Sequence, residues 1–497
     1  MLFNSLQFLI FFPTVTALYF LLPHKYRWFM LLVASCIFYI AFIPVYIFVL
    51  FATILIDYTA GIFIERERGG RKKIYLIISI ISTCFVLFIF KYFNFINGNI
   101  SAISRFLHWN YPVQALQIIL PIGLSFHTFQ SLSYVIEVYW GKQKAEHHFG
   151  IYALYVMFYP QLVAGPIERP QHLLHQFYEK HTFDYNRVTD GLKLMAWGMF
   201  KKVVIADRLA LFVTTVYGRP YDYQGISLLL ATVFFAFQIY CDFSGYTDIA
   251  IGAAQVMGFK LMDNFNRPYS ARSIQEFWRK WNISLSTWFR DYVYIPLGGN
   301  RAPKLRWCFN IFFTFLLSGL WHGANWTFIA WGALHGFYYL FSFWTNKART
   351  NLVRLVHLDK FPRMHNCLQI SITFVLVCFA WIFFRANNIQ ESFYILSHLF
   401  SGIPAFVTKV FSNITALNTG KHIMDDVFLG IDKVEFFIAV TGIIFLEYIH
   451  SIQKHGSIRH MLNNKPLWLR WGIYYCFMIG LLSLGVFENR QFIYFQF

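Results

Sequence analysis

Long apolar runs separated by short polar segments dominate this chain of 497 residues. A helix that crosses a membrane needs about 20 mostly apolar residues. Some runs are short, and one is interrupted by Pro121 and Gly123. We therefore expect about 11 full spans plus one or two re-entrant, broken or interfacial helices. The candidate spans are Leu6–Leu22, Trp28–Ile43, Val45–Ile64, Ile74–Phe90, Leu116–Trp140, Leu192–Val216, Ile226–Met257, Trp307–Leu320, Thr327–Trp344, Leu368–Phe384, Phe436–Tyr448 and Trp471–Phe487.

This pattern predicts an all-α polytopic membrane protein whose helices surround a central cavity. Composition agrees, because 57% of residues are hydrophobic and only 13% are charged, against about 25% charged in soluble proteins. No internal repeat and no Pro/Gly-rich linker is visible, so we expect one transmembrane domain over residues 1–497. Seven scattered cysteines lack metal-ligand spacing, and we expect no metal site.

The basic loops give an orientation. Residues 24–27, 65–73 and 141–144 are rich in Lys and Arg, and they fall on one side if Pro44 marks a turn at the opposite face. Such loops are usually cytoplasmic, which would place the N-terminus outside. The net charge of +18 then indicates contact with anionic lipid rather than with nucleic acid. We expect a multi-pass protein of the inner (cytoplasmic) membrane.

Residues 258–306 are too polar to span. Apolar side chains nevertheless recur at helical spacing from Ile274 to Phe289. This favours a helix at the cytoplasmic interface, either as a peripheral anchor or packed on the protein. Asn282 lies at the edge of the apolar stripe and is expected to face protein. Arg279, Lys280 and Arg290 would lie on other faces.

A histidine follows the apolar run Trp307–Leu320, in the sequence Trp321-His322-Gly323. Imidazole can take and return a proton near neutral pH, and glycine lets a substrate or a second backbone approach closely. Residues 307–345 are thus a candidate catalytic region. The alternative is a buried structural histidine. His335 is expected to support the site or the fold, and His127 to pack.

Two carboxylates, Asp242 and Asp248, lie within an apolar run and need partners there. Glu168 and Arg169 are expected to pair locally within a broken helix. Acidic residues at membrane depth also suit a rival function, a proton-coupled transporter or flippase for a polysaccharide precursor.

Several motifs give the chain a resemblance to a known family. They are Pro160–Ile167, Asp242–Ala250, Asn264–Tyr269, Phe277–Asp291, Tyr294–Asn300, Trp321-His322-Gly323 and the terminal segments Leu2–Ser5 and Phe492–Phe495. In these the chain resembles the membrane-bound O-acyltransferase superfamily. It is most similar to the branch with alginate O-acetylases, peptidoglycan O-acetyltransferases and the D-alanyl transfer protein of teichoic acids.

The resemblance implies a transmembrane O-acyltransferase, in the first instance an O-acetyltransferase. His322 would be the catalytic base. Asn282 stands where this branch often has His, and would orient or polarise. The resemblance further implies no bound cofactor, acetyl-CoA or an acyl carrier thioester as co-substrate, and an extracytoplasmic hydrolase-like transferase as partner. By this resemblance the protein would move the acyl group toward a cell-surface polysaccharide or cell-wall polymer. Expected substrate-binding residues are Arg279, Lys280, Trp281, Arg290, Trp321 and Asp242.

Overall fold

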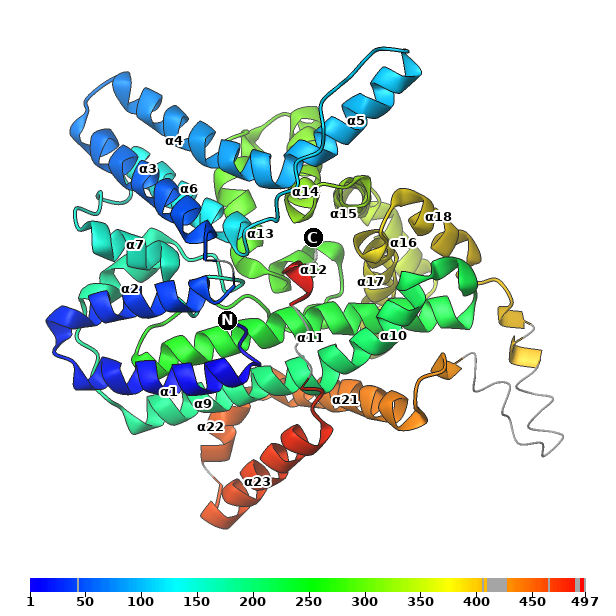
Figure 1. Cartoon of the computed structure of the whole chain (residues 1–497). Helices are drawn as coiled ribbons and strands as arrows, with labels where there is room; N and C mark the ends of the chain where they lie inside the picture. Colours follow the sequence, from blue (N-terminus) through cyan, green and yellow to red (C-terminus); the bar gives the residue numbers. More distant parts are fainter. Residues whose placement is uncertain (43, 405, 409–426, 464, 488–491, 496–497) are drawn as a thin grey trace.

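The computed structural model describes residues 1–42, 44–404, 406–408, 427–463, 465–487 and 492–495, and these residues form helices without a β-strand. The N-terminal part contributes the helices on the left of Figure 1 and, with α5, the projection at its upper right. They are α1 (Leu6–Leu21), α2 (His24–Ile40), α3 (Tyr46–Arg66), α4 (Arg71–Leu87), the π-helical η1 (Phe88–Tyr92), α5 (Phe93–Phe106), α6 (Leu124–Tyr139) and α7 (Phe149–Met157).

The long helix α11 (Ile226–Met257) runs through the centre of the molecule (Figure 1). It has 32 residues, most of which are buried, and it packs against the neighbouring helices α9, η3 and α10. Because α11 carries buried polar residues such as Asp242 and Thr247 within an apolar run, it needs protein rather than lipid around it. The preceding elements are α8 (Pro170–Leu173), η2 (Leu174–Tyr178), α9 (Tyr185–Met199), η3 (Phe200–Ala206), α10 (Asp207–Gly218) and η4 (Pro220–Asp222).

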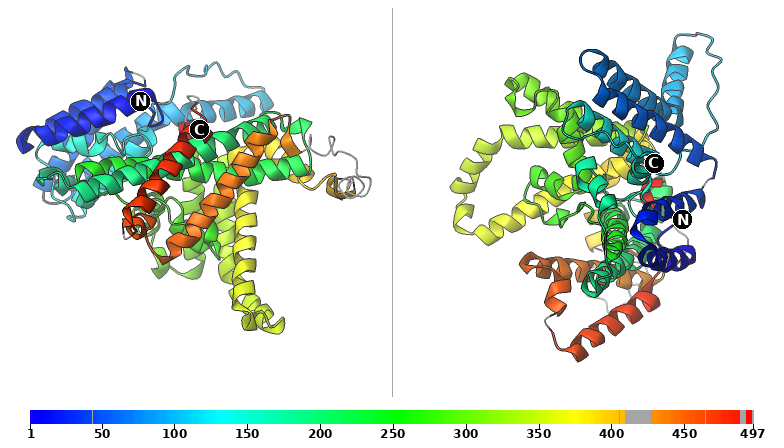
Figure 2. Two further views of the ribbon diagram at one scale, coloured as in Figure 1. Left: turned by 90° about the horizontal axis from the view of Figure 1, so that it is seen from below. Right: turned by 90° about the vertical axis from the view of Figure 1, so that its left-hand side faces the viewer.

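The remaining helices complete the core and build a projecting arm. In Figure 2 the yellow-green arm of α15, α16 and α17 extends away from the body. The elements are η5 (Pro268–Ser270), α12 (Ile274–Lys280), α13 (Ile283–Phe289), η6 (Arg290–Tyr294), η7 (Gly299–Arg301), α14 (Lys304–His322), α15 (Trp326–Trp344), α16 (Asn346–Leu355), η8 (Leu358–Lys360), α17 (Pro362–Arg385), α18 (Ile389–His398), α21 (Lys433–Ile452), η9 (Gln453–His455), α22 (Ile458–Asn463), α23 (Leu467–Leu484) and η10 (Ile493–Phe495).

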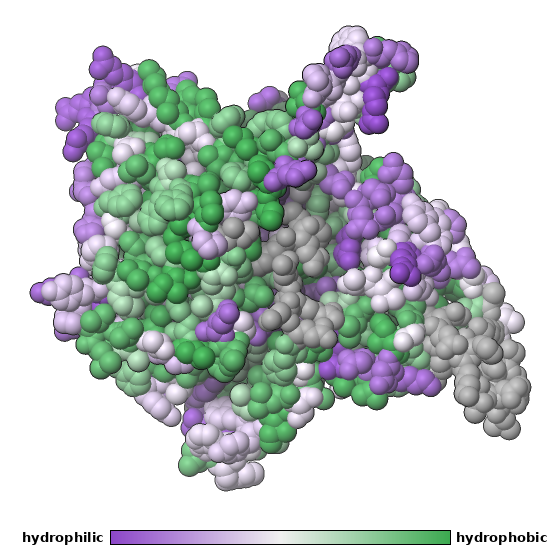
Figure 3. Space-filling view, viewed as in Figure 1, coloured by the Kyte–Doolittle hydropathy of each residue, from purple (hydrophilic) through white to green (hydrophobic). Residues whose placement is uncertain are grey.

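Large apolar side chains cover much of the surface. On the face shown in Figure 3, hydrophobic residues spread over α1 to α4, and hydrophilic residues gather at the α3–α4 loop. Leu6, Leu9 and Phe48, for example, are more than two-thirds exposed. Apolar patches of this extent mark a surface that contacts lipid rather than water.

The all-α polytopic fold predicted from the sequence is confirmed. Among the described residues, six helices are long and apolar enough to cross a membrane: Tyr46–Arg66, Arg71–Phe106, Ile226–Met257, Pro362–Arg385, Lys433–His455 and Leu467–Leu484. Leu6–Leu21 is apolar but shorter. The expected number of about 11 spans stays a prediction.

Two predicted spans have different limits in the structure. The run Leu116–Trp140 is helical only from Leu124, because Pro121 and the left-handed Gly123 (φ 77°) precede the helix. The run Ile74–Phe90 belongs to a longer helix that continues without a break to Phe106. The apolar pattern misses this continuation because Lys91 interrupts it.

Candidate active site

His322 is the last residue of α14. Gly323 then adopts an extended conformation (φ −163°), and Asn325 caps the start of α15 by accepting a hydrogen bond from the Thr327 backbone N–H. A Cβ atom at Gly323 would lie 2.1 Å from the ring of Phe328, so only glycine fits in this turn. The sequence Trp-His-Gly thus places an imidazole at a sharp break between two apolar helices.

Aromatic rings surround the His322 imidazole, which is only 4% exposed. Ring centroids of Trp321, Trp331, Phe384 and Tyr494 lie 4.7 to 5.6 Å from it. Its Nδ1 atom has no hydrogen-bond partner among the described residues. A buried polar atom without a partner costs free energy, so this nitrogen is available to a substrate.

Asn282 separates α12 from α13. Its backbone is left-handed (φ 40°, ψ 60°), a conformation that asparagine tolerates better than most residues. The segment Asn264–Asn266 runs beside this break: Asn264 O accepts from Ile283 N at 2.9 Å, and Asn266 N donates to Lys280 O at 2.9 Å. The prediction of one continuous helix over this stripe is therefore wrong, since the stripe is split into two short helices, whereas its place at the membrane interface stays a prediction.

The Asn282 side chain faces protein, as expected, and is 1% exposed. Neither its amide oxygen nor its amide nitrogen has a hydrogen-bond partner within the described parts of the chain. An amide with both groups buried and unpaired is well placed to hold a polar substrate atom.

A series of aromatic contacts and a buried hydrophobic cluster link the Asn282 segment to the His322 segment. Trp281 contacts Trp381 at a centroid distance of 5.1 Å, Trp381 stacks on Trp331 at 5.9 Å, and Trp331 contacts His322 at 5.0 Å. Trp321 shares a buried cluster with Leu285 of α13. Trp281 and Trp321 thus join the two segments, and their proposed role in binding substrate stays a prediction.

The basic residues predicted to bind the donor have different surroundings. Arg279 and Arg290 are exposed, and Arg290 Nε lies 2.8 Å from Asp291 Oδ1. Lys280 is partly buried and forms an ion pair with Glu276 at 2.8 Å. Partial burial alone would raise the pKa of Glu276, but the hydrogen bond from Lys280 helps to hold it below its usual range. Among the described residues Arg290 and Lys280 have ion-pair partners, so of these three cations Arg279 is the one left for a ligand.

Asp242 lies in the interior of α11 and is engaged by the protein itself. Its Oδ1 is 2.7 Å from Lys202 Nζ, and its Oδ2 accepts a hydrogen bond from Ile493 N at 2.8 Å. The neighbouring Asp248 pairs with Lys201 at 2.8 Å. Asp242 therefore anchors η10, which carries Tyr494 to the His322 ring. Its predicted contact with substrate stays untested.

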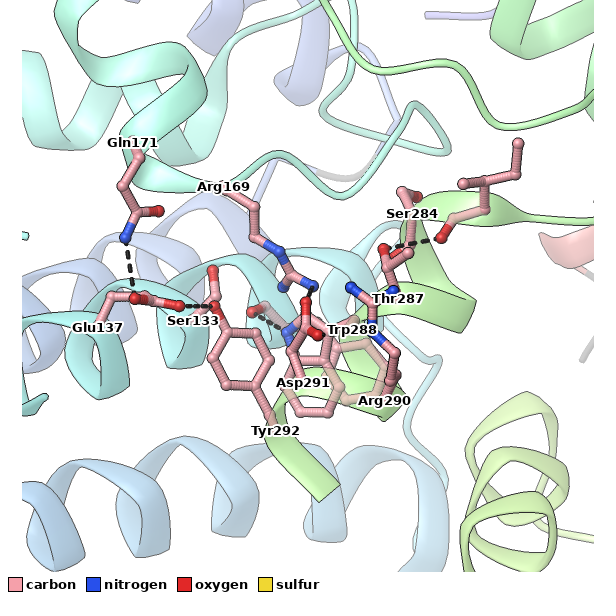
Figure 4. A network of polar contacts seen from close by, with 12 residues as sticks. Ser133, Glu137, Arg169, Gln171, Ser284, Thr287, Trp288, Arg290, Asp291 and Tyr292 are labelled. Carbon is pink, nitrogen blue, oxygen red and sulfur yellow. Dashed lines mark hydrogen bonds and ion pairs between the residues drawn. The ribbon is translucent and has the colours of Figure 1, made fainter. Parts of the chain in front are cut away.

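The local pair predicted between Glu168 and Arg169 is wrong. Figure 4 shows Arg169 directed from the loop before α8 toward Asp291 of η6, at 3.3 Å. Glu168 instead contacts His172 at 2.6 Å and accepts a hydrogen bond from Met262 N. Burial raises the pKa of Glu168, and the hydrogen bond to Glu168 raises the pKa of His172.

The contacts of Figure 4 hold α6, the α8 loop and η6 together. Gln171 and Tyr292 both donate to Glu137 of α6, at 2.9 and 2.7 Å. Trp288 Nε1 donates to Phe129 O at 2.9 Å. These bonds fix the position of α13, the helix that follows Asn282.

Two further polar residues lie near His322. His335 is buried in α15, and its Nδ1 accepts a hydrogen bond from Trp278 Nε1 at 3.3 Å, which agrees with a supporting role. Lys91 Nζ donates to Trp321 O at 2.7 Å and to His322 O at 3.0 Å. Lys91 was not singled out by sequence analysis, where its one signal is a charge directly after an apolar run.

A buried imidazole and a buried amide with unpaired polar atoms are suited to acyl transfer, in which one group takes a proton and the other polarises a carbonyl. Comparison with known sequences identifies the chemistry. The family model for membrane-bound O-acyltransferases matches residues 147–388, which include both side chains. The chain belongs to the membrane-bound O-acyltransferase family.

Family members of known name support this assignment. The chain is 39% identical to "Probable alginate O-acetylase AlgI" of Pseudomonas aeruginosa over 85% of its length and 80% of the relative. It is 35% identical to a peptidoglycan O-acetyltransferase of Helicobacter pylori, over 74% and 72%. A teichoic acid D-alanyltransferase of Bacillus subtilis is 27% identical, over 54% and 69%. The protein is thus a multi-pass membrane acyltransferase, and the branch expected from its motifs is confirmed.

Proposed function

We propose that this acyltransferase is an O-acetyltransferase that supplies acetyl groups to a cell-surface polysaccharide or cell-wall polymer. The observation that carries the proposal is His322, an imidazole buried among aromatic rings with its Nδ1 available. The similarity to an alginate O-acetylase and a peptidoglycan O-acetyltransferase, each over more than two-thirds of both chains, supports the polymer class.

In the proposed reaction a hydroxyl oxygen attacks the carbonyl carbon of a thioester. His322 takes the hydroxyl proton as the C–O bond forms, and returns it to the thiolate as the C–S bond breaks. The Asn282 amide donates a hydrogen bond to the carbonyl oxygen, where negative charge develops. Neither step requires a metal or a bound cofactor.

The donor would be acetyl-CoA or an acylated carrier protein on the cytoplasmic side of the cell membrane. Both carry phosphate, and the exposed Arg279 offers it a positive charge. The acceptor polymer lies on the opposite side, so an extracytoplasmic hydrolase-like transferase would complete delivery. This partner and this orientation belong to the proposal.

The rival function, a proton-coupled transporter, gains no support from Asp242 and Asp248, because each is neutralised by a lysine. Membrane vesicles with radiolabelled acetyl donor separate the two functions. We expect label to reach acceptor at an unchanged rate after a protonophore collapses the proton gradient. If no labelled acetyl ester forms on the acceptor once the proton gradient has collapsed, the result would favour the transporter.

A further inference from the structure

Lys91 lies near the middle of the continuous helix Arg71–Phe106, which is apolar enough to cross a membrane. The helix is π-helical at this point, in η1. A lysine at such a depth is costly and is usually retained for a function, and single π-helical turns are frequent at functional sites. The proposed reaction assigns no role to this residue.

The Lys91 side chain hydrogen-bonds to the C-terminal end of α14. Its ammonium donates to the carbonyls of Trp321 and His322, and its neighbour Tyr92 donates from Oη to Leu320 O at 3.1 Å. The last carbonyls of a helix lack partners within it and carry partial negative charge. A cation at that point both satisfies them and fixes the final turn.

We propose that Lys91 is a positioning residue that acts through His322, because its hydrogen bonds to the carbonyls of Trp321 and His322 fix the last turn of α14 and with it the place of the imidazole. The proposal rests on the proposed function. The titratable groups that face His322 come from three elements: Lys91 of η1, His335 of α15 and Tyr494 of η10. Of these, Lys91 is the one that donates a hydrogen bond to the backbone carbonyl of His322.

The side-chain charge and the hydrogen bonds can be separated by substitution. Lys91→Met removes both, and Lys91→Gln keeps a donor without the charge. Lys91→Arg keeps both, and Tyr92→Phe removes a neutral bond from the same turn. Each variant would be purified as the full chain, its folded amount measured by thermal melting, and turnover and KM for acetyl donor measured between pH 5 and 9.

We expect Lys91→Met and Lys91→Gln to lower kcat per folded molecule by roughly tenfold to a hundredfold, the effect of small displacements of a reacting group, with KM little changed. The acid limb of the profile should move to higher pH, because burial first and the Lys91 charge second lower the pKa of His322, and these variants remove the second cause. Lys91→Arg should retain most of the activity and the acid limb of the parental pH profile. Tyr92→Phe should also retain that acid limb.

Two results would overturn the proposal. One is normal kcat and an unmoved acid limb in both neutral variants. The other is loss of folded protein in proportion to activity, with the pH profile of the remaining enzyme unchanged, which would make Lys91 structural. Failure of this proposal is distinct from failure of the proposed function, because inactivity of His322→Ala would still support the latter.

Discussion

Asn282 occupies a left-handed backbone position with its amide buried and unpaired. We expect Asn282→Ala to lower turnover by roughly tenfold to a thousandfold, as removal of one oriented donor does, whereas Asn282→His is partly tolerated. Alanine also strains the left-handed backbone by about 1 kcal/mol.

Asn282→Gly separates these effects, because glycine accepts the same φ without strain and lacks the amide. Turnover and melting temperature would be measured for all three variants. Full activity of the glycine variant would show that the amide takes no part in catalysis.

Arg279 allows a second residue-scale test. Arg279→Gln should raise the donor KM more than it lowers kcat, because an exposed cation attracts phosphate and salt screens that attraction. Lys280→Gln is the matched comparison, since Lys280 already pairs with Glu276 and its loss should affect stability more than KM. Both would be assayed in zwitterionic lipid. A donor KM that changes only in anionic membranes would assign Arg279 to lipid binding.

At the scale of elements, α14 and α15 cross at two glycines. A Cβ atom on Gly319 would lie 2.3 Å from Phe328 O, and one on Gly332 would lie 2.5 Å from Phe315 O. Small residues allow membrane helices to approach this closely. Gly319→Ala should therefore separate the helices, displace His322 and lower both melting temperature and activity.

Gly472 of α23 is the matched control, because among the described residues no atom outside its own stretch of helix backbone lies within 4 Å of a Cβ atom there. The Gly472→Ala variant should have the melting temperature and the activity of the parent. Equal behaviour of the two alanine variants would show that the α14–α15 crossing does not position the site.

The C-terminal element depends on Asp242. Asp242→Ala removes a partner of the buried Lys202 and the acceptor for Ile493 N. Loss of one member of a buried ion pair costs about 3 kcal/mol, so thermal unfolding should occur well below the parental temperature. Asp242→Asn, which retains an acceptor for Ile493, should be milder. If Asp242→Ala melts normally yet abolishes activity, the carboxylate acts on substrate instead.

At the scale of the whole molecule, the apolar pattern was enough to predict an all-α membrane protein, because burial in lipid requires long apolar helices. It did not locate the break at Asn282, because a left-handed residue leaves the apolar spacing on either side almost unchanged. His322 stood out in the sequence as an imidazole beside glycine. Lys91 did not, because its role depends on contact with a helix more than 200 positions away. The single-domain assignment stays a prediction.

The central claim is that His322 is the catalytic base of a membrane O-acyltransferase. The most direct test is acetyl transfer by His322→Ala, with membrane abundance and acetyl content of the surface glycan measured together. We predict normal abundance and no acetylation above background, since the other buried imidazole near the site, His335, lies within α15 and already accepts a hydrogen bond from Trp278. Near-parental acetylation at normal abundance would contradict the account.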